Sequence, residues 1–408
     1  DYKVGSSGIY SSIASVERDG DDFKVKVTFS APYYPLNTLF AGIVHPALLD
    51  KELFNTGFVD KPHPEYWVGP FTIAEGGWNS TEKTLTLTRN DKWWGATPKL
   101  ETVTLHVLDD SALGQAFANK EIDVLDYIFS ADVYQQASGR DDAEVRQNTG
   151  LQWRHIMFNA SSGPLADKAV RQAIVRACDR EAIAASDLAG LPVDAKKTLL
   201  GNRFFLPVQE GYQDNATSWG HDVEAAKKLL DGAGWVAGSD GVRAKDGTKL
   251  ELVMTIPSNA PVATNEANLL QKQLGEVGIK LSVSTVEIDK YFPEYINKKN
   301  YALTAFTSEK TQYPLANVGQ YYASTSQSNY TGLSVPEVDQ HVAKIGSTPD
   351  GAARNKLANE LAKILWVNVF NIPIYQRMQL TAVPKTLRNF GAQGLASFRP
   401  ERIGYVKS

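Results

Sequence analysis

The fold class of this chain is decided by residues 68–126, which read VGPFTIAEGGWNSTEKTLTLTRNDKWWGATPKLETVTLHVLDDSALGQAFANKEIDVLD. Apolar residues alternate with polar ones at 84–88 and again at 103–107, and this period of two predicts two half-buried strands. An aspartate or serine at 110–111 can cap a short helix, after which residues 122–125 return as a strand. A crossover this compact packs its helix onto a sheet with right-handed sense, so the stretch predicts an open α/β lobe.

A second βαβ unit is predicted further along the chain. Residues 250–256 read as a strand, the apolar positions of 267–277 follow helical spacing, and residues 279–283 lead out as another strand. An earlier helix is predicted after Asp167, which can cap its amino end, and a later one at 338–345.

Several phrases of the chain resemble one known family. They are GPF, RNDKWWG, PKL and NKEIDVLD within 68–126, FNASSGPLADKAVRQAIVRACDREAI at 158–183, DVEAAKKLLDGAGW at 222–235, NYTGLSVPEVD at 329–339 and FNIPIYQ at 370–376. In wording and order they resemble the extracellular solute-binding proteins of ABC importers, in the class that takes up peptides, nickel and some sugars (bacterial solute-binding family 5). The resemblance covers nearly the whole chain.

This resemblance implies an α/β fold of the periplasmic-binding-protein type (type II), with two lobes, a hinge between them and an extra small domain. The implied boundaries are the end of the small inserted domain at 1–64, lobe I at 65–179 plus 378–408, and lobe II at 180–377. Because family members carry further residues upstream, including the first strands of lobe I, we expect the chain to be N-terminally incomplete and to expose apolar edges.

Charge and cysteine content argue against several other classes of protein. The 42 Lys and Arg residues are scattered and nearly balance the 46 Asp and Glu residues. The charge distribution therefore does not indicate binding to a nucleic acid or to an anionic membrane surface. The one cysteine, Cys178, rules out an internal disulfide and thiolate zinc clusters. No apolar run approaches the ~20 residues that span a bilayer.

Sequence signatures of common enzymes are missing. The chain has no G-x-S-x-G, H-E-x-x-H or G-x-x-x-x-G-K-[ST] motif, and its six histidines never fall at metal-ligand spacing along one helix. We therefore expect no catalytic residue, no metal site and no cofactor. Two alternatives stay open: a hydrolase with paired carboxylates that acts on a peptide or glycoside, and a peptide-sensing receptor without transport.

Ligand capture between two lobes needs apolar walls with a few polar groups, and aromatic rings supply area at little cost in side-chain entropy. By their position in the family, the candidate wall residues come from the lobe junction, from the loops before Pro207 and Pro314, and from the hinge. They are Trp153, Arg154, Phe204, Phe205, Phe306, Lys310, Gln312, Tyr313 and Tyr375.

One of these positions differs from what the resemblance implies. In the peptide-binding branch of the family, this loop carries a tryptophan and, four residues before a proline, an aspartate that pairs with the α-amino group of the peptide. Counting back from Pro314 puts Lys310 at that place, with Thr307 where the tryptophan would be and Glu309 beside it. A lysine repels an α-ammonium, so we expect a neutral, acidic or N-blocked ligand, or a peptide in another register. The alternative is that Lys310 simply points to water.

The predicted function is that of a substrate-binding protein of an ABC importer: a monomer that captures a small solute, with an oligopeptide as the first candidate class. Closure about the hinge buries the ligand, and a membrane permease recognises the closed form. Such a protein works outside the cytoplasm, in the periplasm or lipid-anchored to the outer face of the cell membrane.

Overall fold

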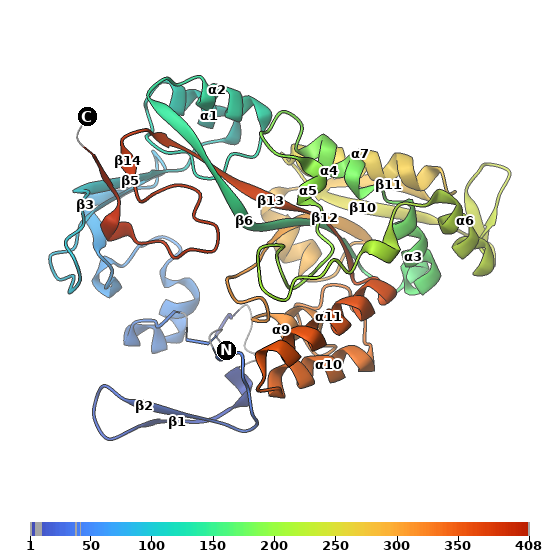
Figure 1. The fold of residues 1–408 in the computed structure, drawn as a ribbon, viewed down its shortest axis with the longest axis horizontal. Coiled ribbons are helices and arrows are strands. Elements are labelled where there is room, and N and C mark those ends of the chain that lie inside the picture. The colour runs from blue at the N-terminus through green and yellow to red at the C-terminus, as the bar shows by residue number, and fades with distance from the viewer. Residues whose placement is uncertain (1, 5–9, 37–38, 41, 407–408) are drawn as a thin grey trace.

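A five-stranded mixed sheet lies at the centre of the computed structural model, which describes residues 2–4, 10–36, 39–40 and 42–406. Its strand order is β11-β10-β12-β6-β13 (Figure 1). The strands of this sheet are β6 (Ala143–Phe158), β10 (Glu251–Pro257), β11 (Lys280–Val286), β12 (Leu303–Glu309) and β13 (Asn371–Pro384). β10 pairs in parallel with β11 and β12, whereas β6 pairs antiparallel with β12 and β13.

Helices and smaller sheets surround the central sheet. The helices are α1 (Asp110–Ala118), α2 (Ala131–Ser138), α3 (Lys168–Ala177), α4 (Arg180–Asp187), α5 (Ala195–Thr198), α6 (Val223–Gly232), α7 (Pro261–Gly275), α8 (Ile288–Lys290), α9 (Val318–Tyr322), α10 (Pro336–Ser347) and α11 (Gly351–Asn368). The remaining strands are β1 (Ile13–Arg18), β2 (Val25–Phe29), β3 (Phe71–Asn79), β4 (Thr84–Arg89), β5 (Thr102–His106), β7 (Val236–Ala237), β8 (Arg243–Lys245), β9 (Thr248–Lys249), β14 (Leu387–Arg388) and β15 (Gly404–Tyr405).

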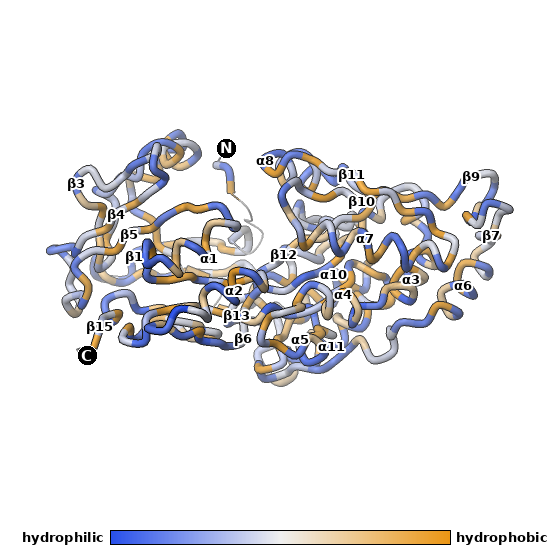
Figure 2. The backbone as a smooth tube through the Cα atoms, turned by 90° about the horizontal axis from the view of Figure 1, so that it is seen from above, coloured by the Kyte–Doolittle hydropathy of each residue, from blue (hydrophilic) through white to orange (hydrophobic). Residues whose placement is uncertain are grey.

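The long strands β6 and β13 carry the chain between two bodies. They pair from Asn371 opposite Met157 to Pro384 opposite Ala143, with register shifts on either side of Gln376. Figure 2 shows β6, β12 and β13 between a body that holds α1, α2 and β3 to β5 and a body that holds α3, α6, α7 and β7 to β11. This is the two-lobed α/β arrangement expected from the sequence.

The second body contains the predicted βαβ unit, with α7 as the crossover between the parallel strands β10 and β11. Asp167 caps α3 as predicted, because its side chain accepts a hydrogen bond from the N–H of Ala169 at 2.9 Å. The predicted boundaries put α3 in lobe I, but α3 packs in one apolar cluster with α6 and α7. We therefore propose that the lobe boundary runs through β6 rather than at residue 179.

The predicted strand at 122–125 is wrong. β3, β4 and β5 form an antiparallel sheet of their own, and Leu125 makes only an isolated bridge with Ala382 of β13. Residues 122–125 form too few inter-strand backbone hydrogen bonds to pair with β5 as a strand. Leu125 instead packs with Phe117 and Leu380 in a core under the long strands. The first body is thus attached to β13 through this core.

Parts of the first body and of the amino-terminal hairpin β1–β2 leave apolar side chains open to solvent. Phe23 at the hairpin turn and Trp94 are 96% and 85% exposed. Leu105 of β5 is also exposed, because none of the described residues covers its side chain. The prediction of a half-buried strand therefore fails at Leu105.

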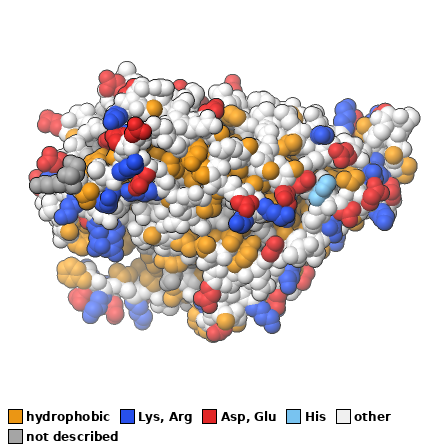
Figure 3. All heavy atoms as spheres, turned by 45° about the horizontal axis from the view of Figure 1, so that its top comes forward, with side chains coloured by type: hydrophobic (Ala, Val, Ile, Leu, Met, Phe, Trp, Pro, Cys, Tyr) orange, Lys and Arg blue, Asp and Glu red, His pale blue; other side chains and the backbone are white. Residues whose placement is uncertain are grey.

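The surface mixes both signs of charge. Figure 3 shows basic and acidic side chains interspersed on the face that it displays. Among the helices that the structure describes, none combines the length and the apolar character needed to cross a membrane.

Candidate functional site

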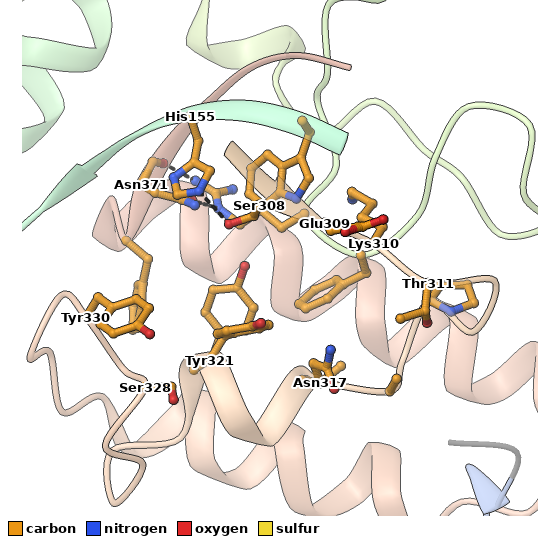
Figure 4. Close-up of a pocket in the computed structure, with 18 of the residues that line it drawn as sticks. His155, Ser308, Glu309, Lys310, Thr311, Asn317, Tyr321, Ser328, Tyr330 and Asn371 are labelled. Carbon is orange, nitrogen blue, oxygen red and sulfur yellow. Dashed lines mark hydrogen bonds between the residues drawn. The ribbon is translucent and has the colours of Figure 1, made fainter. Parts of the chain in front are cut away.

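Two adjoining cavities meet at the carboxyl end of β12. An outer groove of about 410 Å³ lies between residues 309–312 and the tail segment 394–397, and Leu151 also lines it. An inner chamber of about 70 Å³ lies behind it, between the strands β6 and β12 and the segment 311–331 (Figure 4). Residues 309–311 line both cavities, so the chamber and the groove share a wall.

Strand alternation decides which side chains of β6 and β12 reach the chamber. Trp153, His155 and Met157 are spaced two apart on β6 and all line it. Across the antiparallel pairing, Phe306 lies opposite His155 and Ser308 lies opposite Trp153, so the two strands form one continuous wall. This wall is aromatic, with two hydrogen-bonding side chains set into it.

His155 is held in the middle of the wall. Its Nε2 and the hydroxyl oxygen of Ser308 are 2.8 Å apart, and its ring centroid lies 4.4 Å from that of Trp153 and 4.5 Å from that of Phe306. Burial, reinforced by the charges of nearby Arg154, lowers the pKa of His155 well below its usual range. The imidazole is therefore neutral, and Nδ1 has no hydrogen-bond partner among the described residues.

Lys310 is buried at the wall that the chamber and the groove share. Its Nζ donates to the carbonyl oxygens of Asn202 at 3.2 Å and Phe205 at 3.4 Å, and lies 5.2 Å from the ring centroid of Trp153. Burial, together with the charge of Arg203, lowers the pKa of the Lys310 ammonium well below its usual range. The alternative that Lys310 points to water is wrong, because only 7% of the residue is exposed.

Arg203 supplies a second buried cation. Its Nε donates to the Asn371 side-chain oxygen at 2.6 Å, its Nη2 donates to the Asn371 carbonyl oxygen, and its guanidinium lies 4.3 Å from the centroid of the Trp366 ring. Burial lowers the pKa of Arg203 to about 9. Its remaining nitrogen, Nη1, has no partner in the part of the chain that the structure describes.

The structure brings six of the nine predicted wall residues to these cavities. Five line the inner chamber and Gln312 lines the outer groove. The five are Trp153, Phe204, Phe306, Lys310 and Tyr313.

The other three predicted residues lie elsewhere. Arg154 follows Trp153 on the strand and so points to the opposite face of the sheet, where its Nε donates to the Oε1 of buried Glu266 at 2.9 Å. Phe205 is fully buried in the core against α11, because the turn at 202–205 aims it inward while its neighbour Phe204 faces the chamber. Tyr375 lies on β13 and is buried in the apolar core of the second body.

The sequence reasoning missed His155, Arg203 and Ser308. A signal for His155 was present, because it lies two residues from the predicted wall residue Trp153 in a stretch, 151–159, whose pattern predicts a strand. Ser308 lies two residues after the predicted wall residue Phe306, but in a stretch that was predicted to be a loop, whereas the structure continues β12 to Glu309. No local signal singled out Arg203, whose place depends on Asn371 of β13, far along the chain.

Known proteins similar to this chain point to one family. The family profile described as bacterial extracellular solute-binding proteins, family 5 Middle, matches residues 2–331. The chain belongs to this family. The substrate-binding role predicted from the sequence is thereby confirmed.

Curated relatives agree with membership of family 5. The oligopeptide-binding protein OppA of Mycobacterium tuberculosis (strain ATCC 25618 / H37Rv) is 33% identical over 411 residues, covering 100% of this chain and 68% of that protein. The oligopeptide-binding protein AppA of Bacillus subtilis (strain 168) is 27% identical over 299 residues, covering 70% of this chain and 52% of that protein.

Solved structures share the fold of this family 5 chain. The periplasmic EDTA-binding protein EppA superimposes with a TM-score of 0.86 at 23% identity, covering 98% of this chain and 76% of that one. The oligopeptide-binding protein AppA from Bacillus subtilis, in complex with a nonapeptide, superimposes with a TM-score of 0.83 at 21% identity, covering 100% and 81%. At these identities the likeness shows the two-lobed architecture.

Proposed function

We propose that this protein captures oligopeptides outside the cytoplasm and presents them to the permease of an ABC importer. The observation that carries the proposal is the outer groove, whose walls come from the end of β12 and from the tail segment 394–397. A site walled by segments so distant in sequence can open and close when the bodies that carry them move. The oligopeptide-binding relatives support a peptide as the ligand.

The chemistry of the groove suits a peptide main chain. Gly394, Ala396 and Ser397 have short side chains, so little side-chain bulk separates a ligand in the groove from the main chain of this segment. Backbone groups bind a peptide through its amide groups whatever its side chains are, and side-chain pockets then set the preference. The inner chamber is such a pocket beside the groove.

We further propose that the α-ammonium of a bound peptide does not lie at residue 310. Lys310 and Arg203 are both cations or potential cations at this place, and a third positive group there would be repelled. The ligand is released intact, because delivery to a permease requires no bond to be broken. Recovery of a cleaved ligand would instead favour a hydrolase.

A thermal-shift screen tests the proposed function. Short peptides, sugars and metal chelates would each be added at rising concentration, and a ligand at about 100 times its Kd should stabilise the folded protein by about 2.7 kcal/mol. We expect peptides to raise the melting temperature and mass spectrometry to recover them uncleaved. A response to sugars or chelates with none to any peptide would contradict the proposal.

A further inference from the structure

Two residues that line the inner chamber carry a buried nitrogen atom without a hydrogen-bond partner among the described residues. Among the residues that the structure describes, the buried side-chain nitrogens without a hydrogen-bond partner are His155 Nδ1 and Arg203 Nη1. Both residues line the chamber, and both are more than nine-tenths buried. Arg203 Nη1 is a donor without an acceptor, while His155 Nδ1 is a donor or an acceptor according to the tautomer of the ring. Buried polar groups in folded proteins are almost always paired, so this pair of residues favours a polar partner that comes from outside the chain.

The chamber also has an excess of positive charge. Lys310 and Arg203 line it, and in the described part of the chain neither forms an ion pair with a carboxylate. The one carboxylate on the lining belongs to Glu309, which is exposed. The pKa of Tyr127, in the first body, is raised by burial, then by the charge of Asp126, and then by the charge of Glu309. Glu309 lines the groove as well as the chamber and forms no ion pair with Arg203 or Lys310 among the described residues. Arg203 is thus a buried cation without an ion pair, and Lys310 is a buried amine whose pKa is lowered.

Burying cations without countercharges costs stability, and protein sites accept that cost where a ligand supplies the missing charge. We propose that the inner chamber is a subsite for a carboxylate of the ligand, held by Arg203, Lys310 and His155. This inference rests on the proposed function, since the carboxylate belongs to a peptide whose main chain lies in the outer groove. Its source is either an acidic side chain or the terminal carboxylate.

The size and the walls of the chamber fit such a group. The volume of about 70 Å³ has room for several water molecules and therefore for the carboxylate of a ligand. Rings of Trp153, Phe306 and Phe204 exclude water around it, and this strengthens a charge-assisted hydrogen bond. Arg203 is already oriented by Asn371, so it loses little freedom when it binds.

The buried amine makes binding sensitive to protons. Because the pKa of Lys310 is lowered well below its usual range in the empty site, an incoming carboxylate should draw a proton onto the amine. Calorimetry in buffers of different ionisation enthalpy should therefore show proton uptake when an acidic peptide binds. A neutral peptide should bind without it.

The first test of the subsite does not depend on peptides. Glutarate and its uncharged diamide would be compared by thermal shift on the wild-type protein, on Lys310→Met and on the matched control Lys363→Met, an exposed lysine of α11. We expect glutarate alone to stabilise the wild type and the control, and neither compound to stabilise Lys310→Met. A response of Lys310→Met equal to that of the wild type would overturn the proposal, as would no response of the wild type.

The second test identifies the source of the carboxylate. Short peptides in which glutamine is replaced by glutamate at each position in turn, and peptides with a free or amidated carboxyl end, would be titrated by calorimetry. We expect either one glutamate position or the free carboxyl end to tighten Kd by about tenfold or more in the wild type and in Lys363→Met. This gain should be absent in Lys310→Met.

The outcomes separate the two proposals. Equal affinities for acidic and neutral peptides would overturn the carboxylate subsite and leave peptide capture intact. If no peptide binds, the proposed function fails, and the glutarate response alone decides on the subsite. Lys310→Met should fold, because an apolar side chain of similar volume replaces a buried amine, and its melting temperature without ligand checks this.

Discussion

The carboxyl group of Asp187, at the end of α4, lies beside the buried ion pair of Arg154 and Glu266. Its Oδ1 accepts a hydrogen bond from Asn265 at 2.8 Å, while its Oδ2 has no donor among the described residues. Burial, followed by the charge of Glu266, raises the pKa of Asp187 to about 7. The folded protein therefore keeps a proton on Asp187 that the unfolded chain loses at lower pH.

This pKa predicts the direction of one pH effect. The folded pKa is raised above the ordinary value of 3.8, so the contribution of Asp187 to stability is fully present below about pH 4 and is lost as the pH rises through about 7. One pKa unit corresponds to about 1.4 kcal/mol, so the loss is on the order of 4 kcal/mol. We expect Asp187→Asn to remove it, making the variant more stable than the wild type at pH 8.

Urea unfolding at a series of pH values measures this effect. The matched control is Asp289→Asn, which changes an exposed aspartate and should keep the wild-type profile. An Asp187→Asn variant with the same pH profile as the wild type would show that Asp187 ionises normally.

At the scale of elements, the paired strands β6 and β13 connect the two bodies. The pairing register of these strands is irregular between the two bodies. The register shifts on both sides of Gln376, whose side-chain amide donates to the carbonyl oxygen of Gly150 at 2.6 Å. A Cβ at Gly150 would overlap the carbonyl oxygen of Arg377. The strands thus approach each other here more closely than any side chain at position 150 allows.

We expect Gly150→Ala to destabilise the protein by about 1 to 3 kcal/mol, because backbone rather than a flexible side chain must move. The control is Gly275→Ala at the end of α7, where a Cβ meets no atom within 4 Å. That change should be neutral or stabilising by up to about 1 kcal/mol. Equal melting temperatures for the two variants would refute the close approach at the crossing.

At the scale of the whole molecule, the outer groove joins parts of the chain that are far apart in sequence. One wall is the loop after β12 and the other is the tail segment 394–397. The tail is tied to β6 near this point, because Asn148 Nδ2 donates to the carbonyl oxygen of Ala392 at 3.1 Å. β12 pairs with β6 at Gln152, so both walls of the groove are attached to this long strand.

This arrangement predicts a change of shape on ligand binding. Small-angle X-ray scattering should show a smaller radius of gyration when a stabilising peptide is added, because a ligand that contacts both walls favours the closed form. A peptide of the same composition that gives no thermal shift is the control. An unchanged radius with a saturating, stabilising peptide would mean that the groove binds without closure.

Local patterns of the sequence determined much of the architecture. Helical spacing behind Asp167 and the strand, helix and strand of 250–283 are confirmed as α3 and as β10, α7 and β11. Such periodicity is a property of neighbouring residues, so one chain is enough to show it. The order of family phrases similarly indicated two lobes and a substrate-binding role, as family membership confirms.

Only the tertiary structure decided which residues share the site. Period two on β6 places His155 beside Trp153 and turns Arg154 away, although Arg154 and not His155 was predicted for the wall. The same period could not supply Arg203, which Asn371 holds in place. The burial of Lys310 and the docking of Leu125 on β13 likewise depend on partners far along the chain. The physical reason is that a cavity is lined by non-local packing, whereas sequence periodicity reports only on which side of its own element a residue lies.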